Sequence, residues 1–357
     1  MSEVNSNQKR ETDSFTALIY FGRHGGGVYL TRDYAKEILQ GDHRFVVMAN
    51  SESDLMNEAR SISIQIFYPF STPSIFEFLL NPLSRYRFKG NVKDFLLDKR
   101  VSHILVSMPH YTDLLVNKIC RSLNIRTGII IHDFKSHPGE FWPSRSSILR
   151  RARSFDQVFT LSNYISSQLH KEYAINSIKL NFPVNEKAKS RIVKGDAKFS
   201  YFLLVGRLKK YKGISKFLAE WQKLTPVGKP NLLIAGRGAS NFSDDGVLTI
   251  DKWLTEGELI DVMRRSEGII LPYTEASQSG ILDLSIQLNL NVFLFAVGGL
   301  SEQVANYSNA RVFGVGDYQG IIDSLLVNEI TPNQKWVFDS NSEHKAQSLT
   351  VTMQNGF

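Results

Sequence analysis

The chain has 357 residues, about twice the usual length of a domain, and this length predicts two domains with a sizeable core. Lys and Arg number 42 against 35 Asp and Glu, and the net charge of +7 favours an acidic partner such as anionic lipid, a phosphorylated small molecule or nucleic acid. The single cysteine excludes an internal disulfide, and the polar start lacks the apolar core of a signal peptide. No window has the roughly 18 apolar residues of a membrane span. We therefore expect a cytoplasmic protein with a disordered tail over residues 1–14.

Apolar runs of strand length alternate with helical patterns through the first half of the chain. The helical patterns include Tyr29–Gln40 and Thr112–Asn124, in which apolar residues recur at three- and four-residue spacing. This alternation predicts βα units and a mainly parallel sheet. The predicted strands are Thr16–Arg23, Arg44–Ala49, Ser61–Tyr68, His103–Met108, Thr127–His132 and Gln157–Leu161.

The same alternation starts again after a polar stretch, Lys187–Lys198, which is typical of a linker. The sequence thus predicts an α/β fold with two Rossmann-like domains facing a central cleft, 15–186 and 199–330, and residues 331–357 stay unassigned. Ligands of such domains bind at the carboxyl ends of the strands. The strands predicted in the second domain are Tyr201–Val205, Asn231–Ala235, Val247–Ile250, Gly268–Pro272, Asn291–Phe295 and Arg311–Val315.

Two carboxylates bracket a strand-to-helix junction in LPYTEASQSGILDLSIQLN, residues 271–289. We expect the helix to start near Ser277 to Ser279, where its free backbone N–H groups can bind an anion. Glu275 precedes the helix, whereas Asp283 shares a helix face with Ser279. A phosphate at the helix start, with a hydroxyl bound by a carboxylate on each side, would fit this pattern. The alternative is that both carboxylates only complement the helix dipole.

Three further junctions of the same kind carry polar or glycine residues. In Val205–Gly213, Arg207 and Lys212 follow a strand and can clamp a diphosphate, or they can be surface charge. The run Gly25–Gly27 allows close approach of backbone to a ligand, although a tight turn also explains it, and it is not the dinucleotide fingerprint. His132 ends a buried strand, where we expect it to line the cleft. A metal site is not predicted, because His132 and His137 have no further ligands at suitable spacing.

A basic, aromatic stretch lies between Ser84 and Arg100, with six basic and two acidic residues. A solvated helix face is the simpler interpretation, and contact with anionic lipid is the more specific one. A second basic cluster, Arg145 to Arg153, has no nearby acid in the sequence. Nucleic-acid binding is not expected, because no recognition module accompanies these residues. The residues assigned to the membrane or acceptor patch are Arg85, Arg87, Lys89 and Lys93.

The ordered set of motifs resembles the family-4 retaining glycosyltransferases of the GT-B fold over nearly the whole chain, from Thr16 to about Glu329. The family signature of two glutamates separated by seven residues is present as E275-ASQSGIL-D283, with an aspartate in the second place. GRLKKYKG and AVGGLSEQV are similar to the phosphate-binding segment and the glycine turn of the family. RHGGG, IHDFKSHPGE and LSNYISSQL are similar to its opening glycine loop, its His-containing segment and its short serine-led helix.

The resemblance implies a role for each site residue. Glu275 would hold the donor sugar, Asp283 the ribose, and Arg207 with Lys212 the leaving diphosphate, while His132 would face the sugar. These cations would stabilise charge that develops in the transition state, and neither a metal nor a cofactor is implied. Backbone N–H groups that would surround the phosphates belong to Gly25, Gly26, Gly27, Ser277, Gln278, Ser279 and Gly280.

The expected activity is therefore transfer of a sugar from a nucleotide-diphosphate donor to a lipid-linked or oligosaccharide acceptor in polysaccharide biosynthesis, with the protein peripheral on the inner face of the cell membrane. One alternative is a soluble nucleotide-sugar enzyme, either an epimerase or a synthase of a small glycoside. A second is a catalytically silent partner subunit, which the shorter side chain of Asp283 suggests. Trp253 precedes a helix and is expected to pack in the core rather than beside a nucleobase.

Overall fold

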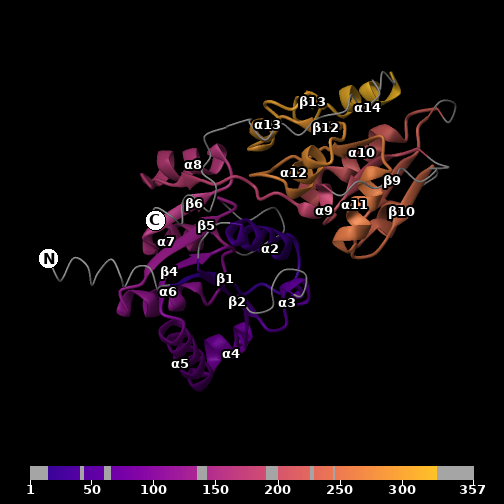
Figure 1. Cartoon of the computed structure of the whole chain (residues 1–357). Helices are drawn as coiled ribbons and strands as arrows, with labels where there is room; N and C mark the ends of the chain where they lie inside the picture. The colour runs from indigo at the N-terminus through magenta and orange to yellow at the C-terminus, as the bar shows by residue number, and fades with distance from the viewer. Residues whose placement is uncertain are drawn as a thin grey trace. The chain divides into compact units, whose positions relative to one another are not determined.

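The computed structural model shown in Figure 1 describes residues 15–40, 44–59, 66–134, 143–189, 200–225, 229–243 and 246–327. These residues form two compact units, which divide between Val184 and Asn185, and each unit is described by itself. The tail expected over 1–14, the unassigned segment 331–357 and most of the expected linker lie outside the described residues.

The first unit is built on a seven-stranded sheet in which every pair of neighbouring strands is parallel. The strand order is β3-β2-β1-β4-β5-β6-β7. The strands are β1 (Phe15–Tyr20), β2 (Phe45–Asn50), β3 (Phe67–Phe70), β4 (Val101–Val106), β5 (Arg126–Ile131), β6 (Gln157–Thr160) and β7 (Ile178–Lys179). The helices are α2 (Gly26–Leu39), α3 (Asp54–Glu58), α4 (Ile75–Leu80), α5 (Pro82–Asp98), α6 (Asp113–Ser122), α7 (Arg145–Ser154) and α8 (Asn163–Tyr173).

The central strands of this sheet are buried on both faces. Successive residues of a strand point to opposite faces, so Ala17 and Ile19 of β1 enter one core cluster while Leu18 and Tyr20 enter the other. Strands that are covered on both sides need apolar side chains at every position, and this need explains their nearly continuous hydrophobic sequences.

The second unit has a six-stranded parallel sheet in the order β10-β9-β8-β11-β12-β13. Its strands are β8 (Phe202–Val205), β9 (Leu232–Ala235), β10 (Val247–Ile250), β11 (Gly268–Leu271), β12 (Val292–Phe295) and β13 (Ala310–Phe313). Its helices are α9 (Glu186–Lys189), η3 (Lys210–Lys212), α10 (Ile214–Trp221), η4 (Ala239–Phe242), α11 (Glu256–Arg264), α12 (Gly280–Gln287), α13 (Leu300–Gln303) and α14 (Tyr318–Leu326). Leu203 and Val205 face one core cluster, and Phe202 and Leu204 face the other.

The structure confirms the predicted α/β class and almost every predicted strand. The third strand is an exception, because β3 runs from Phe67 to Phe70 and not from Ser61 to Tyr68, of which residues 61–65 lie outside the described part. The two-residue strand β7 was not predicted. Lys187 and Ala188, at the start of the expected linker, lie in helix α9.

Candidate functional site

In the second unit, two strand-to-helix connections meet at the carboxyl edge of the sheet. Strands β8 and β11 are parallel neighbours, so the segments that follow them leave the sheet side by side. The backbone N–H of Thr274, after β11, donates to the carbonyl of Tyr211, after β8, at 2.7 Å. Gly213 has a φ of +70°, and a Cβ placed there would lie 2.0 Å from the carbonyl oxygen of Pro272. Only glycine therefore fits at this contact, which fixes the two segments against each other.

Lys212 lies inside this junction. Its side chain is buried, and its Nζ donates to the hydroxyl of Tyr273 at 2.6 Å. Burial disfavours the ammonium form and lowers the pKa of Lys212 to about 8. The Nζ also lies 3.2 Å from where a Cβ of Gly206 would be, so the cation sits directly beneath the end of β8. Arg207, the other predicted cation, is exposed at the same strand end.

Helix α12 begins at Gly280, close to the predicted position. The hydroxyl of Ser279 accepts the N–H of Leu282 at 3.2 Å and caps the helix. Gln303 then binds both backbone groups of Ser279: its Oε1 accepts the N–H at 2.8 Å, and its Nε2 donates to the carbonyl at 3.2 Å. The Ser279 N–H is thus bonded to Gln303, and its contact with a phosphate stays a prediction. The N–H groups of Gly280 and Ile281 belong to the first turn, where a helix supplies no carbonyl partner.

The remaining predicted donor residues lie around the same helix start. Glu275 is partly exposed in the loop before the helix, Ser277 is buried and Gln278 is partly exposed. Asp283 lies one turn into α12, where its Oδ2 accepts from Nε2 of Gln287 at 2.6 Å. The structure therefore gathers the predicted residues of the second unit at one sheet edge, with a cation, a helix start and two carboxylates.

In the first unit, the glycine run is divided between a cap and a helix. Gly25 is the N-cap of α2 with a φ of +100°, while Gly26 and Gly27 are its first two residues. A Cβ on Gly27 would lie 2.9 Å from Met108 and from Tyr20, so this glycine is explained by packing within the protein. Cβ atoms on Gly25 and Gly26 would meet no protein atom within 4 Å. Close approach to a ligand thus stays a prediction for Gly25 and Gly26.

His132 directly follows β5 and is 8% exposed, so it is more deeply buried than expected for a residue that lines a cleft. Its Nε2 lies 2.7 Å from the carbonyl oxygen of Ser107, which can only accept a hydrogen. Nε2 therefore carries the proton, and burial lowers the pKa of His132 so that the ring is neutral at pH 7. Ser107 is held in turn, because its hydroxyl donates to the carbonyl of Ile19 at 3.1 Å.

Residues that the sequence did not single out lie at the same edge of the first sheet. His110 follows β4 and is partly buried, its ring centroid lies 5.7 Å from that of Phe21, and burial lowers its pKa to about 4. Arg151 is buried and pairs with Asp113 at 2.7 Å, although the sequence shows Arg151 only as part of a basic cluster. The partner is 38 residues away in the chain, and no local pattern could reveal it.

The predicted basic patch is exposed along α5, where Arg85, Arg87, Lys89 and Lys93 all reach solvent. Trp253 is 49% exposed, so the expectation that it packs in the core is wrong. It follows β10 on the same edge of the second sheet as Arg207.

In the part of the chain that the structure describes, no group of three or more His, Cys, Asp or Glu side chains could hold a metal ion. None of the described helices is long and apolar enough to cross a membrane.

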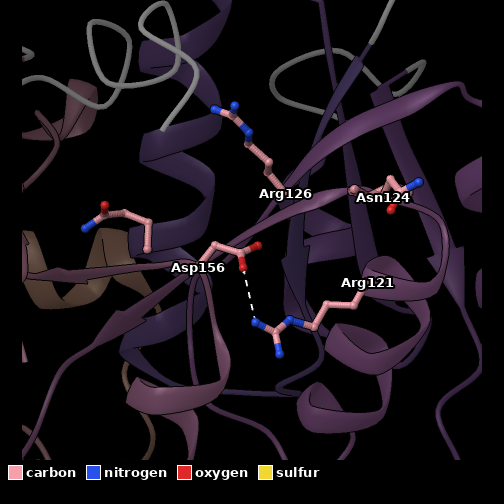
Figure 2. Close-up of a pocket in the computed structure, with 6 residues that line it drawn as sticks. Arg121, Asn124, Arg126 and Asp156 are labelled. Carbon is pink, nitrogen blue, oxygen red and sulfur yellow. Dashed lines mark hydrogen bonds and ion pairs between the residues drawn. The ribbon is translucent and has the colours of Figure 1, made fainter.

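A cavity of about 490 Å³ lies at the opposite, amino edge of the first sheet, where β5 and β6 begin (Figure 2). Arg121 points toward Asp156 and pairs with it at 3.4 Å, while Asp156 also accepts the N–H of Thr127 at 2.9 Å. These contacts hold the two strand starts together. The cavity is separated from His132 by the length of β5 and is not part of the site at the carboxyl edge. Its lining residues are Arg121, Asn124, Ile125, Arg126, Asp156 and Gln157.

Comparison with solved structures places this architecture among known folds. Anabaena Alr3699/HepE, solved in complex with UDP and glucose, is 13% identical over 88% of this chain and 89% of its own, with a TM-score of 0.68. The chain has the GT-B fold. Sucrose-phosphate synthase from Thermosynechococcus elongatus matches with 14% identity, 88% and 90% coverage, and a TM-score of 0.67.

Two further solved structures match most of the chain. The lipopolysaccharide outer core galactosyltransferase WaaB matches with 14% identity, 87% and 91% coverage, and a TM-score of 0.59. The UDP-GlcNAc 2-epimerase from Methanocaldococcus jannaschii matches with 10% identity, 90% and 94% coverage, and the same TM-score of 0.59. No protein-family model matches the chain, and no curated protein matches it by sequence. At these identities the likeness establishes the fold, and the reaction must be argued from the residues.

Proposed function

We propose that the protein is a retaining glycosyltransferase of the family-4 type, which moves a sugar from a nucleotide-diphosphate donor to a hydroxyl of a lipid-linked or oligosaccharide acceptor. The observation that carries this proposal is the junction in the second unit. There, the first turn of α12, the buried Lys212 and the exposed Arg207 lie at one sheet edge, and this combination suits a diphosphate. Solved complexes of the similar HepE contain UDP and UDP-glucose, and this supports a nucleotide-sugar donor here.

The proposed reaction breaks the bond between the anomeric carbon and the diphosphate oxygen. The acceptor's hydroxyl oxygen takes the place of that diphosphate oxygen on the carbon, and the hydroxyl proton is released. Lys212 and Arg207 would stabilise the charge that builds on the departing diphosphate, so that no metal is needed. Glu275 would hold the hydroxyls of the donor sugar, and Asp283 would bind the ribose after releasing Gln287.

The remaining parts of the proposal concern the acceptor and the location. His132, neutral and fixed by the Ser107 carbonyl, would face the donor sugar, as the family resemblance implies. WaaB, a lipopolysaccharide galactosyltransferase, has the same fold, and this supports a role in bacterial surface polysaccharide. We place the reaction in the cytoplasm at the inner face of the membrane. The single cysteine, Cys120, is buried, and the exposed basic residues of α5 suit an anionic surface.

Two other functions fit the same fold. A nucleotide-sugar epimerase is supported by the match to UDP-GlcNAc 2-epimerase. A catalytically silent subunit is supported by Asp283, whose carboxylate is one methylene shorter than that of glutamate and is already bonded to Gln287.

The first test is the melting temperature of the purified protein with UDP, GDP, ADP and their common sugar conjugates. A ligand that binds the folded state raises the midpoint by mass action. We expect one nucleotide series to stabilise the wild type, the Arg207→Ala variant to respond much less, and the Glu275→Ala variant to respond to the free diphosphate but not to the additional sugar. Lack of stabilisation by every nucleotide, in a well-folded protein, would contradict the proposal and favour the silent subunit.

A further inference from the structure

The corner formed by α4 and the start of α5 exposes an unusual number of large apolar side chains. Soluble proteins rarely leave such side chains clustered in solvent, and a cluster of this kind marks a binding surface. Figure 1 shows the two helices side by side at one end of the first unit. The side chains and their exposed fractions are Ile75 (45%), Phe76 (73%), Leu79 (62%), Leu80 (78%), Leu83 (56%) and Tyr86 (74%), which together we call the apolar corner.

The apolar corner is held in a fixed shape. Ser74 and Glu77 form a capping box at the start of α4. Asn81 ends α4 and at once caps α5, because its Oδ1 accepts the N–H groups of Leu83 at 3.0 Å and Ser84 at 3.1 Å. The two helices are thus joined without a loop, and the outward direction of their side chains follows from hydrogen bonds at the joint.

Helix α5 carries apolar side chains on two sides, and only one of these sides meets the core. Phe88, Val92 and Leu96 recur every fourth residue and are buried. Leu83, Tyr86, Gly90, Lys93 and Leu97 recur at alternating intervals of three and four residues, which aligns them along a second side of the helix. This second side continues the apolar corner along α5 and brings Lys93 to it, with Leu97 54% exposed at its far end.

The charge around this surface selects the partner. From Ser74 to Arg100 there are six basic and three acidic residues, a net +3. Two of the acids are occupied, because Glu77 accepts the N–H of Ser74 at 2.7 Å and Asp98 pairs with Lys99 at 2.9 Å. Apolar side chains flanked by Lys and Arg match a bilayer with anionic head groups, in which the apolar groups enter the acyl region and the cations stay at the phosphates.

The surface is connected to the carboxyl edge of the first sheet. Phe78 lies on the inner side of α4, and its ring centroid is 5.6 Å from that of Tyr111, which follows β4. Tyr111 also donates a hydrogen bond to the carbonyl of Pro73, just before α4, and its ring centroid lies 4.0 Å from that of His110. Tyr111 thus links the apolar corner to His110 at this sheet edge.

We propose that the apolar corner inserts into the anionic lipid surface of a membrane and presents the head group of a membrane-anchored acceptor to His110 and Tyr111. The part of this inference that concerns the acceptor rests on the proposed function, because only a glycosyltransferase would need to reach a lipid-linked acceptor. The binding of lipid itself is independent of donor chemistry and is measured without a donor.

The test is co-sedimentation of the full chain with vesicles of phosphatidylcholine alone and of phosphatidylcholine mixed with phosphatidylglycerol. We expect binding to the mixed vesicles that weakens as salt is added. A Leu79→Ser/Leu80→Ser variant should lose at least about tenfold in partitioning for each side chain withdrawn from the acyl region. An Arg87→Gln/Lys93→Gln variant should lose roughly fivefold for each charge, and only with the anionic vesicles.

The matched control is Leu326→Ser/Val327→Ser, which changes two adjacent exposed apolar residues at the end of α14 and should bind vesicles like the wild type. Melting temperatures of all variants should be equal, because the replaced side chains are exposed. Equal sedimentation of the Leu79→Ser/Leu80→Ser variant and the wild type would overturn the proposal. A wild-type dimer that this variant dissociates would also overturn it, since the corner would then serve a second copy of the chain. Vesicle binding without any nucleotide-induced stabilisation would leave this inference intact and refute the proposed function.

Discussion

The buried Lys212 makes diphosphate binding sensitive to pH in a range where arginine does not titrate. With a pKa of about 8, roughly nine-tenths of Lys212 is protonated at pH 7 and roughly one-tenth at pH 9. The second ionisation of a terminal phosphate has a pKa of about 6, so a nucleoside diphosphate gains little charge over this range, and arginine side chains are not deprotonated in proteins. If only the ammonium form binds the diphosphate, affinity falls about tenfold between these two pH values, which corresponds to about 1.4 kcal/mol.

The assay is calorimetric titration at pH 7, 8 and 9 with the nucleoside diphosphate that stabilises the wild type best. The Lys212→Met variant should bind more weakly at pH 7 and should show no decline in affinity toward pH 9. The control is Lys210→Met, which removes an exposed lysine of the same turn and should keep the wild-type decline. An affinity of the wild type that does not change with pH, or a decline that persists in Lys212→Met, would refute the assignment of Lys212 to the diphosphate.

Three further predictions follow from other contacts. Gly213→Ala would place a Cβ 2.0 Å from the Pro272 carbonyl at a φ of +70°, so we expect a loss of roughly 2–4 kcal/mol of unfolding free energy in a denaturant titration. A Cβ on Gly280 would meet no protein atom within 4 Å, so the Gly280→Ala variant should keep the wild-type stability. If a phosphate lies against the Gly280 N–H, the same variant should bind the nucleotide at least about tenfold more weakly. Unchanged affinity would exclude this contact. Burial holds the pKa of His110 near 4 against 6.5 in the unfolded chain, so the unfolded state takes up the proton first and acidification from pH 7 to pH 5 destabilises the fold. The His110→Asn variant should lose about 1 to 2 kcal/mol less than the wild type over this interval, and an equal loss would show that His110 is not buried as described.

The sequence predicted the strands well because buried parallel strands need apolar residues on both faces. The central strands β1, β5 and β8 can be recognised in the sequence for this reason, because their residues enter core clusters on both faces of the sheet. The edge strands were harder to place: β7 has two residues, and β3 contains Pro69, which only an edge strand tolerates. Alternating residues after Ser61 resembled a half-buried strand more closely than the segment that forms β3.

The site was predictable as a set of positions but not as a set of contacts. Arg207 and Lys212 look alike in the sequence, whereas the structure exposes the first and buries the second against Tyr273, a residue 61 positions later. The same limit applies to Gln303, which holds Ser279 across 24 positions. Partners of this kind come together only when neighbouring strands pair, and no local spacing encodes them.

The apolar corner shows a different limit. The basic residues of α5 are visible as a run in the sequence, but apolar residues at helical spacing normally indicate a buried face. Leu83 and Phe88 are both apolar residues that could be buried. Only the packing of α5 on the sheet buries Phe88 and leaves Leu83 exposed.

Sugar transfer from a nucleotide donor is best measured as release of nucleoside diphosphate from UDP-, GDP- and ADP-sugars, with and without a bacterial membrane lipid extract. We predict that one donor is consumed, that consumption depends on the lipid extract, and that Arg207→Ala slows it by roughly 100-fold because a charge that stabilises the transition state is gone. Conversion of the donor into an isomeric nucleotide sugar without release of diphosphate would contradict sugar transfer and assign the protein to the epimerases. No consumption of any donor by a protein that binds nucleoside diphosphate would also contradict it.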